Sequence, residues 1–124
     1  MKILLSIKPN YVAEITCGTK LYEFRKTLYR RKDVNTIVVY SSSPVCRVVG
    51  EIEVEEVLCD TPEKLWNKTY RAAGISKDKY KAYFEGRSRG YAIKIKAYHP
   101  YPEPLRLNDM YPGVTPPQSF CYVE

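Results

Sequence analysis

The sequence is poor in the side chains that usually bind metals. It contains a single histidine, His99, and none of its four cysteines forms a C-x-x-C pair with another. Zinc sites normally draw their ligands from such close pairs. We therefore expect no metal site, and no stretch of the chain predicts a cofactor.

Long hydrophobic runs are also missing. The apolar run in "MKILLSIKPN" at residues 1–10 is too short for a signal peptide, and no later run approaches the length of a membrane-spanning helix. We expect a cytoplasmic protein with no membrane partner. In that compartment the four cysteines are expected to be reduced thiols: Cys17, Cys46, Cys59 and Cys121.

Acidic residues are in deficit. Fourteen Asp and Glu stand against twenty Lys and Arg, which gives a formal charge of +6 and a pI near 9.1. This balance favours anionic partners, nucleic acid first, although charge alone does not determine the fold. The 124 residues match the common size of one domain, and no repeat or linker divides them, so we expect a single domain over 1–124.

Turn residues and hydrophobic patterns divide the chain into strands and helices. Strands are expected at 2–8, 20–26, 36–43, 46–60 and 90–99, with a last short strand within 119–124. A short helix is expected after the first strand, with Asn10 as its N-cap and Gly18 at its end. Thr61-Pro62 and Ser76 predict the starts of helices over 62–73 and 77–85, with Trp66 and Phe84 in the core. Gly50 suggests a bulge. These elements predict an α+β fold built on a closed or nearly closed sheet, with the two helices outside it.

The stretch "GTKLYEFRK" at 18–26 holds the main candidate site. On a strand Glu23 and Arg25 share one face, and Lys20 lies just past the end of the preceding helix. Arg25 can hold a phosphate or a base edge with its planar fork, and Glu23 can accept hydrogen bonds from a base amino group. A desolvated Lys20 would be a nucleophile or a base. The alternative is an ordinary salt bridge at a strand edge.

Two further segments offer weaker candidates. Ser41 and Ser42 end a strand where hydroxyl and backbone N–H groups can receive an anion, although serines before a proline also form ordinary turns. Gln118 and Ser119, in "PPQSF", follow two prolines and can cover a cleft, and glutamine can read a base edge. Their alternative is a loop that only satisfies backbone groups.

Four segments together resemble the ASCH domain family: "SIKPNYVAEITCGTKLYEFRK", "VVYSSSP", "VVGEIEVEEV" and "PPQSFCYV". The most specific part is the G-x-K-x-x-E-x-R arrangement of Gly18, Lys20, Glu23 and Arg25. The resemblance implies a PUA-like small mixed β-barrel with a cleft whose floor holds these three charged residues. It also implies RNA binding or a coactivator role, while some related proteins cleave RNA or hydrolyse N4-acetylcytidine. The amidohydrolase relatives carry a glutamate near the turn between the two middle helices and a threonine at the position of Glu23.

Three functions follow from these residues. The first is a module that binds RNA, a nucleotide or a nucleoside in a basic cleft. The second is a small hydrolase, a ribonuclease or an amidohydrolase acting on an acylated nucleoside, with Lys20 and Glu23 as catalytic residues. The third is a protein-interaction domain with a partner in transcription or RNA metabolism. We expect attraction by Glu23 to outweigh desolvation, so that Lys20 stays charged at pH 7 and serves binding.

Overall fold

The computed structural model describes all 124 residues and places every strand in one six-stranded sheet, in the order β2-β5-β4-β3-β1-β6. Neighbouring strands run antiparallel, except that β1 and β3 are parallel. The strands are β1 (Lys2–Ile7), β2 (Tyr22–Arg25), β3 (Thr36–Ser41), β4 (Arg47–Asp60), β5 (Gly90–Leu105) and β6 (Phe120–Val123).

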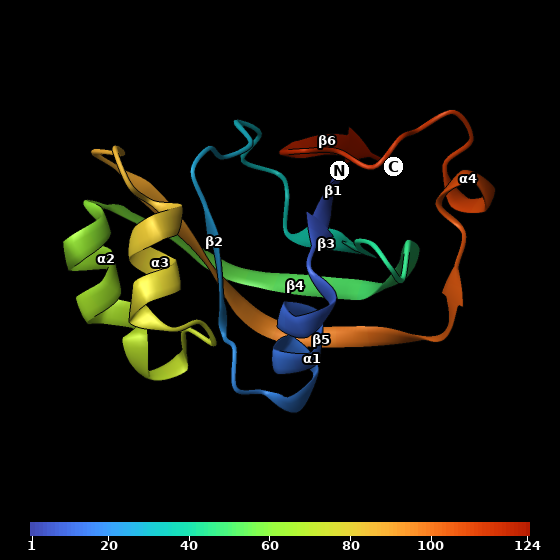
Figure 1. Cartoon of the computed structure of the whole chain (residues 1–124). Helices are drawn as coiled ribbons and strands as arrows, with labels where there is room; N and C mark the ends of the chain where they lie inside the picture. The colour runs from blue at the N-terminus through green and yellow to red at the C-terminus, as the bar shows by residue number, and fades with distance from the viewer.

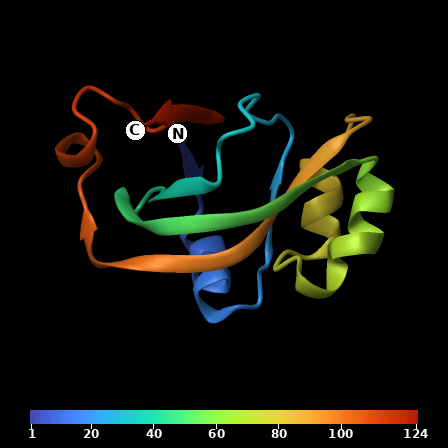
Figure 2. The ribbon, with the colours of Figure 1, turned by 180° about the vertical axis from the view of Figure 1, so that it is seen from behind.

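The helices lie at the two ends of the curled sheet and beside its middle (Figure 1). They are α1 (Pro9–Cys17), α2 (Pro62–Thr69), α3 (Lys77–Tyr83) and α4 (Leu107–Met110), with a 3-10 turn, η1, at Tyr70–Ala72. The pair α2 and α3 lies at one end of the long β4–β5 ribbon and α4 at the other, as the view from behind also shows (Figure 2). No helix combines the length and apolarity that crossing a membrane requires.

The α+β class is confirmed, and of the two expected forms of the sheet, closed or nearly closed, the fully closed form is absent. Strands β2 and β6 are the two edges of the sheet and form no ladder with each other. Side chains join the two edges instead. The Arg25 guanidinium donates to the Ser119 carbonyl at 2.8 Å, and the Tyr122 hydroxyl accepts from the backbone N–H of Arg30 and Arg31 at 3.0 and 3.2 Å. We call this line of contact between the two edges the seam. Side chains, and not paired backbone strands, hold it together.

The helix starts follow the capping signals in the sequence. The side chains of Thr61 and Ser76 accept hydrogen bonds from backbone N–H groups three residues on, as predicted. The start of α1 differs from the prediction: the helix begins at Pro9, and Lys8, not Asn10, occupies the N-cap position. Proline favours the first helical position because its fixed φ suits the helix and it has no N–H to satisfy there.

Strand β5 is longer than predicted. It continues past residue 99 to Leu105, through Pro100, Pro102 and Pro104. Gly50 on β4 allows this pairing, since a Cβ there would lie 2.7 Å from both the His99 carbonyl and the Tyr98 hydroxyl. The register of the β4–β5 pair shifts beside Gly50, which confirms the predicted bulge.

The core has separate parts under the sheet and under the helical pair. Ile3, Ile37 and Ile52 are fully buried in the largest cluster. Under α2 and α3, Leu65 and Phe84 are buried, the latter as predicted, whereas Trp66 is only half-buried and packs at the edge of that cluster. The tryptophan therefore keeps part of its ring accessible.

Replacing Leu65 with alanine tests how far the helical pair depends on its core. Leu65 is 0% exposed. We expect Leu65→Ala to lower the free energy of unfolding by about 2–5 kcal/mol, because it removes buried methyl groups and leaves a cavity. Leu105→Ala is the matched control at a site 39% exposed, where the change should stay within about 0.5 kcal/mol. Urea denaturation monitored by circular dichroism measures both losses of unfolding free energy. Equal losses for the two variants would contradict the assignment of Leu65 to the core.

Candidate functional site

A cleft of about 680 Å³ opens where residues of β1, α1, β2 and α3 meet. Four cationic side chains and one acidic side chain line it: Lys8, Lys20, Arg25, Lys79 and Glu23. Aromatic rings from Tyr11, Phe24 and Tyr83 complete much of the wall. The cleft thus combines excess positive charge with flat apolar surfaces.

Lys20 lies at the buried floor of the cleft and is only 2% exposed. Its ammonium Nζ donates to the Ala73 carbonyl at 2.8 Å and lies 5.0 Å from the ring centres of both Tyr11 and Phe24. Both rings present favourable surfaces to a cation. The hydrogen bond and the two rings offset part of the cost of burying the charge.

Gly74 makes room for the stem of Lys20. Its φ is +64°, and a Cβ at this position would lie 2.4 Å from the Lys20 Cβ. A glycine is therefore required both for the backbone conformation and for the close packing. The turn itself, Ala72-Ala73-Gly74, has no acidic side chain and contacts Lys20 through the Ala73 carbonyl.

The expectation that attraction by Glu23 controls the pKa of Lys20 is wrong. Burial lowers that pKa below its ordinary value of 10.5, and this effect exceeds the opposing attraction of Glu23 and Glu14. The reason is visible in the geometry. Glu23 pairs with Arg25, carboxylate to guanidinium, at 3.3 Å and forms no ion pair with Lys20.

Glu23 and Arg25 lie together at the cleft, as their shared strand face predicts. Their side chains are 8% and 14% exposed. The Arg25 fork contacts Glu23 through Nη1 and the Ser119 carbonyl through Nη2. The guanidinium is therefore held in position before any ligand arrives.

The serines at the end of β3 do not line the cleft. Ser41 is buried at 2% exposure within the sheet, between Ile7 of β1 and Arg47 of β4. The backbone N–H of Ser42 donates to the Ile7 carbonyl at 3.0 Å. The structure thus places Ser41 in the sheet and Ser42 in the turn, and neither in the cleft wall.

The loop before β6 is tied to the edge of the cleft. The Ser6 hydroxyl donates to the Pro117 carbonyl at 2.8 Å, and the Ser119 hydroxyl lies 3.0 Å from that of Thr27. Gln118 is exposed between these two anchored residues. The loop borders the cleft through Ser6 and Arg25, which line it, but Gln118 and Ser119 themselves do not.

Sequence reasoning missed several lining residues, chiefly Lys8, Tyr11, Lys79 and Tyr83. Lys8 and Tyr11 lie at the start of α1, which proline at the first helical position marks in the sequence, but no local pattern places them beside Lys20. Lys79 and Tyr83 come from a helix nearly sixty residues away in sequence, and no local pattern links them to β2. No group of three or more His, Cys, Asp or Glu side chains is placed to hold a metal ion.

Together the sheet and the cleft define a small α+β protein of the PUA-like type with a basic and aromatic cleft. The family model of the ASCH domain matches residues 5–101, and the chain belongs to this family. The resemblance to this family, whose most specific part is the arrangement of Gly18, Lys20, Glu23 and Arg25, is thereby confirmed.

Relatives and solved structures agree with this assignment. The chain is 27% identical over 123 residues to an "ASCH domain-containing ribonuclease" of Zymomonas mobilis. This match covers 97% of this chain and 82% of that relative. The chain is also 31% identical over 99 residues to large ribosomal subunit protein uL22 of Ureaplasma parvum. This match covers 77% of this chain and 32% of that relative. It therefore spans about a third of that relative's length.

Among solved structures, the crystal structure of ASCH from Zymomonas mobilis superposes with a TM-score of 0.90 at 26% identity, covering 99% of this chain and 87% of that one. The N-terminal domain of Staphylothermus marinus McrB reaches a TM-score of 0.57 at 14% identity, with 92% and 81% covered. The second likeness concerns the fold alone.

Alanine at Gly74 tests the contact that buries Lys20. Gly86→Ala is a matched control, because Gly86 also has a positive φ (+77°) but nothing lies within 4 Å of its added Cβ. We expect Gly86→Ala to cost about 1 kcal/mol of unfolding free energy through backbone strain alone. Gly74→Ala should cost about 1–3 kcal/mol more, because it also overpacks Lys20. Equal losses in urea denaturation would refute the contact.

The pH dependence of stability tests the lowered pKa of Lys20. Because the pKa in the folded state lies below the ordinary 10.5, the unfolded chain binds more protons between these two values. Stability due to Lys20 must therefore rise with pH up to about 10.5. We expect the difference in unfolding free energy between wild type and Lys20→Met to shift in favour of wild type as the pH rises through this window. A difference in unfolding free energy that stays constant with pH, or that shifts in favour of Lys20→Met, contradicts the lowered pKa.

Proposed function

We propose that this protein binds RNA or a nucleotide in the cleft floored by Lys20, Glu23 and Arg25. The observation that carries the proposal is the convergence of these three side chains beside aromatic rings in one cleft. An ordinary salt bridge at a strand edge does not require a buried ammonium in the same cleft. Membership of the ASCH family and a relative named a ribonuclease support the choice of RNA.

Each floor residue has capacity left for a ligand. An ammonium has three N–H donors, and Lys20 uses one, on the Ala73 carbonyl. Arg25 has five donors in a planar fork that suits a phosphate or the edge of a base. Glu23 is an acceptor for a base amino group. The floor therefore suits a polar base or a phosphate.

The rim supplies longer-range attraction. Lys8 and Lys79 line the cleft and are exposed. Exposed lysines act on phosphates as point charges, while the rings of Tyr11 and Tyr83 offer surfaces on which bases stack. This combination of a basic groove with aromatic side chains is typical of proteins that bind single-stranded nucleic acid.

Salt dependence and one substitution test the binding function. For single-stranded RNA held through about four phosphates, the log–log slope of affinity against salt should be about −3, at roughly −0.7 per phosphate. Arg25→Gln should weaken binding at least about tenfold, since it removes a charged contact worth about 1.5–3 kcal/mol. Lys96→Gln, at an exposed lysine paired with Glu53, is the control of equal charge and should leave affinity within about threefold. Fluorescence anisotropy with labelled RNA measures all three. Affinity that ignores both salt and Arg25 rejects the proposal.

A second candidate is an RNA-cleaving enzyme. Two observations favour it: the lowered pKa of Lys20 and the name of the Zymomonas mobilis relative. In this case neutral Lys20 acts as a general base toward a ribose 2′-hydroxyl, with Glu23 as its acid/base partner. At the turn where amidohydrolase relatives carry a glutamate, this chain offers the Ala73 carbonyl, so we do not extend the proposal to acylated nucleosides. The comparisons give no support to a protein-interaction role.

Product analysis separates binding from cleavage. A binding module leaves labelled single-stranded RNA intact after prolonged incubation, whereas an enzyme yields shorter fragments and spares the 2′-deoxy strand. If cleavage occurs, Lys20→Met should abolish it while Lys96→Gln retains it, because Lys20 is the proposed general base and Lys96 lies outside the cleft. Cleavage that survives Lys20→Met would point to a contaminating nuclease or to another base.

A further inference from the structure

A second hollow, of about 710 Å³, lies between α2 and α3. Its aromatic lining comes from Trp66, Tyr80 and Phe84, and its cationic lining from Lys77, Lys81 and Arg87. Glu63 is its one acidic residue. We call this hollow, between α2 and α3, the helical groove. It has the same combination of rings and positive charge as the cleft but shares no residue with it.

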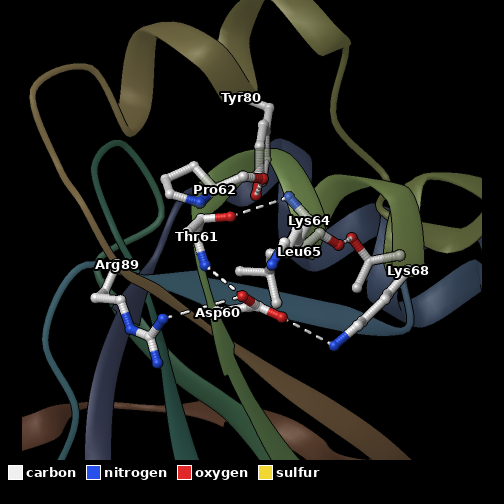
Figure 3. A network of polar contacts seen from close by, with 9 residues as sticks. Asp60, Thr61, Pro62, Lys64, Leu65, Lys68, Tyr80 and Arg89 are labelled. Atoms are coloured by element: carbon white, nitrogen blue, oxygen red, sulfur yellow. Dashed lines mark hydrogen bonds and ion pairs between the residues drawn. The ribbon is translucent and has the colours of Figure 1, made fainter.

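The walls of the helical groove are fixed in advance. The Tyr80 hydroxyl of α3 donates to the Pro62 carbonyl at the start of α2 at 2.7 Å. Figure 3 shows the network beside this contact, in which the Asp60 carboxylate accepts from the Thr61 N–H at 2.8 Å and from the Lys68 ammonium at 3.0 Å. The Tyr80–Pro62 bond joins α3 to the start of α2, and the Asp60 contacts fasten α2 to the end of β4.

Two cations of the helical groove, Lys77 and Lys81, have no side-chain partner, while Arg87 Nη2 donates to the Lys26 carbonyl at 3.4 Å. None of Lys77, Lys81 and Arg87 takes part in an ion pair, although eight ion pairs occur in the structure. The nearby Lys68 and Arg89, by contrast, both pair with Asp60. Lys77, Lys81 and Arg87 thus line the groove without a carboxylate partner.

Trp66 supplies a surface for stacking. It is half-buried, its ring centre lies 4.7 Å from that of Tyr80, and it lines the groove. The ring packs against the core on one side and lines the groove with the cations on the other. Aromatic rings beside basic residues are where single-stranded nucleic acid places its bases and phosphates.

From this geometry we propose that the helical groove is a second RNA subsite, in which a base stacks on Trp66 and the flanking phosphates meet Lys77, Lys81 and Arg87. The inference rests on the proposed binding of RNA in the cleft. Helix α3 forms the ridge between the two sites, since Lys79 and Tyr83 line the cleft while Lys77 and Lys81 line the helical groove. One strand that crosses this ridge, about 10–12 Å wide, contacts both.

The single tryptophan of the chain makes the inference directly testable. An oligouridylate of about ten nucleotides, long enough for a site of this size, should quench the fluorescence of Trp66. Uridine monophosphate at a saturating concentration should bind in the cleft and leave that fluorescence unchanged. A strand of equal length made of abasic ribose phosphates should bind through its phosphates without the quenching, because it has no base to stack.

Variants that replace a lysine by neutral glutamine locate the phosphate contact in the helical groove. Lys81→Gln should reduce the magnitude of the salt slope for the oligouridylate by about 0.7, the value of one phosphate contact on a single strand. Lys64→Gln is the matched control, because Lys64 is an exposed lysine of the neighbouring helix that lines neither hollow. It should leave the slope unchanged. Neither variant should change the affinity for uridine monophosphate.

The outcomes separate the two proposals. Binding that depends on Arg25 but leaves Trp66 fluorescence and the Lys81→Gln slope unchanged overturns the second subsite and leaves the cleft proposal standing. Absence of any RNA binding overturns both. Quenching of Trp66 by an acidic peptide such as polyglutamate, and not by the oligouridylate, also overturns the subsite and identifies the groove as a docking surface for protein.

Discussion

The burial of one ammonium group constrains much of this structure. Lys20 brings a positive charge to a place that is almost free of solvent, and an unsatisfied buried charge is costly. The charge is stabilised by three separate segments: Tyr11 of α1, Phe24 of β2 and the carbonyl of Ala73 beyond η1. None of these groups is near another in sequence, so satisfying the charge requires the helix, the strand and the turn to meet at one point.

The backbone around Lys20 is held as firmly as its side chain. The N–H of Leu21 donates to the Ala72 carbonyl at 2.8 Å, and the Leu21 carbonyl accepts from Ile95 at 2.9 Å. The residues that follow α1 are thereby fixed between η1 and β5 before β2 begins. A rigid floor of this kind suits recognition, because little ordering remains to be done when a ligand binds.

Local signals in the sequence predicted the elements well, since each was marked by a residue with one strong conformational preference. Thr61 and Ser76 start helices, Gly18 ends one with a positive φ, and the alternation on β2 brings Glu23 and Arg25 together. These preferences act within a few residues. They required no knowledge of the rest of the chain.

The features that sequence reasoning missed depend on contacts between distant segments. The expectation for the pKa of Lys20 set attraction by Glu23 above desolvation, although Arg25 holds that carboxylate and the burial comes from elements far along the chain. Strand patterns left a closed and a nearly closed sheet both possible, because they do not reveal whether the last edge pairs with the first. Lys79 joined the cleft only through the packing of α3.

The seam between β2 and β6 places two demands on one residue. Arg25 holds the Ser119 carbonyl across the gap and also presents its charge to the cleft. A lysine in its place would keep the charge but lacks a planar fork that reaches Glu23 and Ser119 together. A substitution of Arg25 therefore alters two things together, the charge of the cleft and the contact that joins the two edges of the sheet.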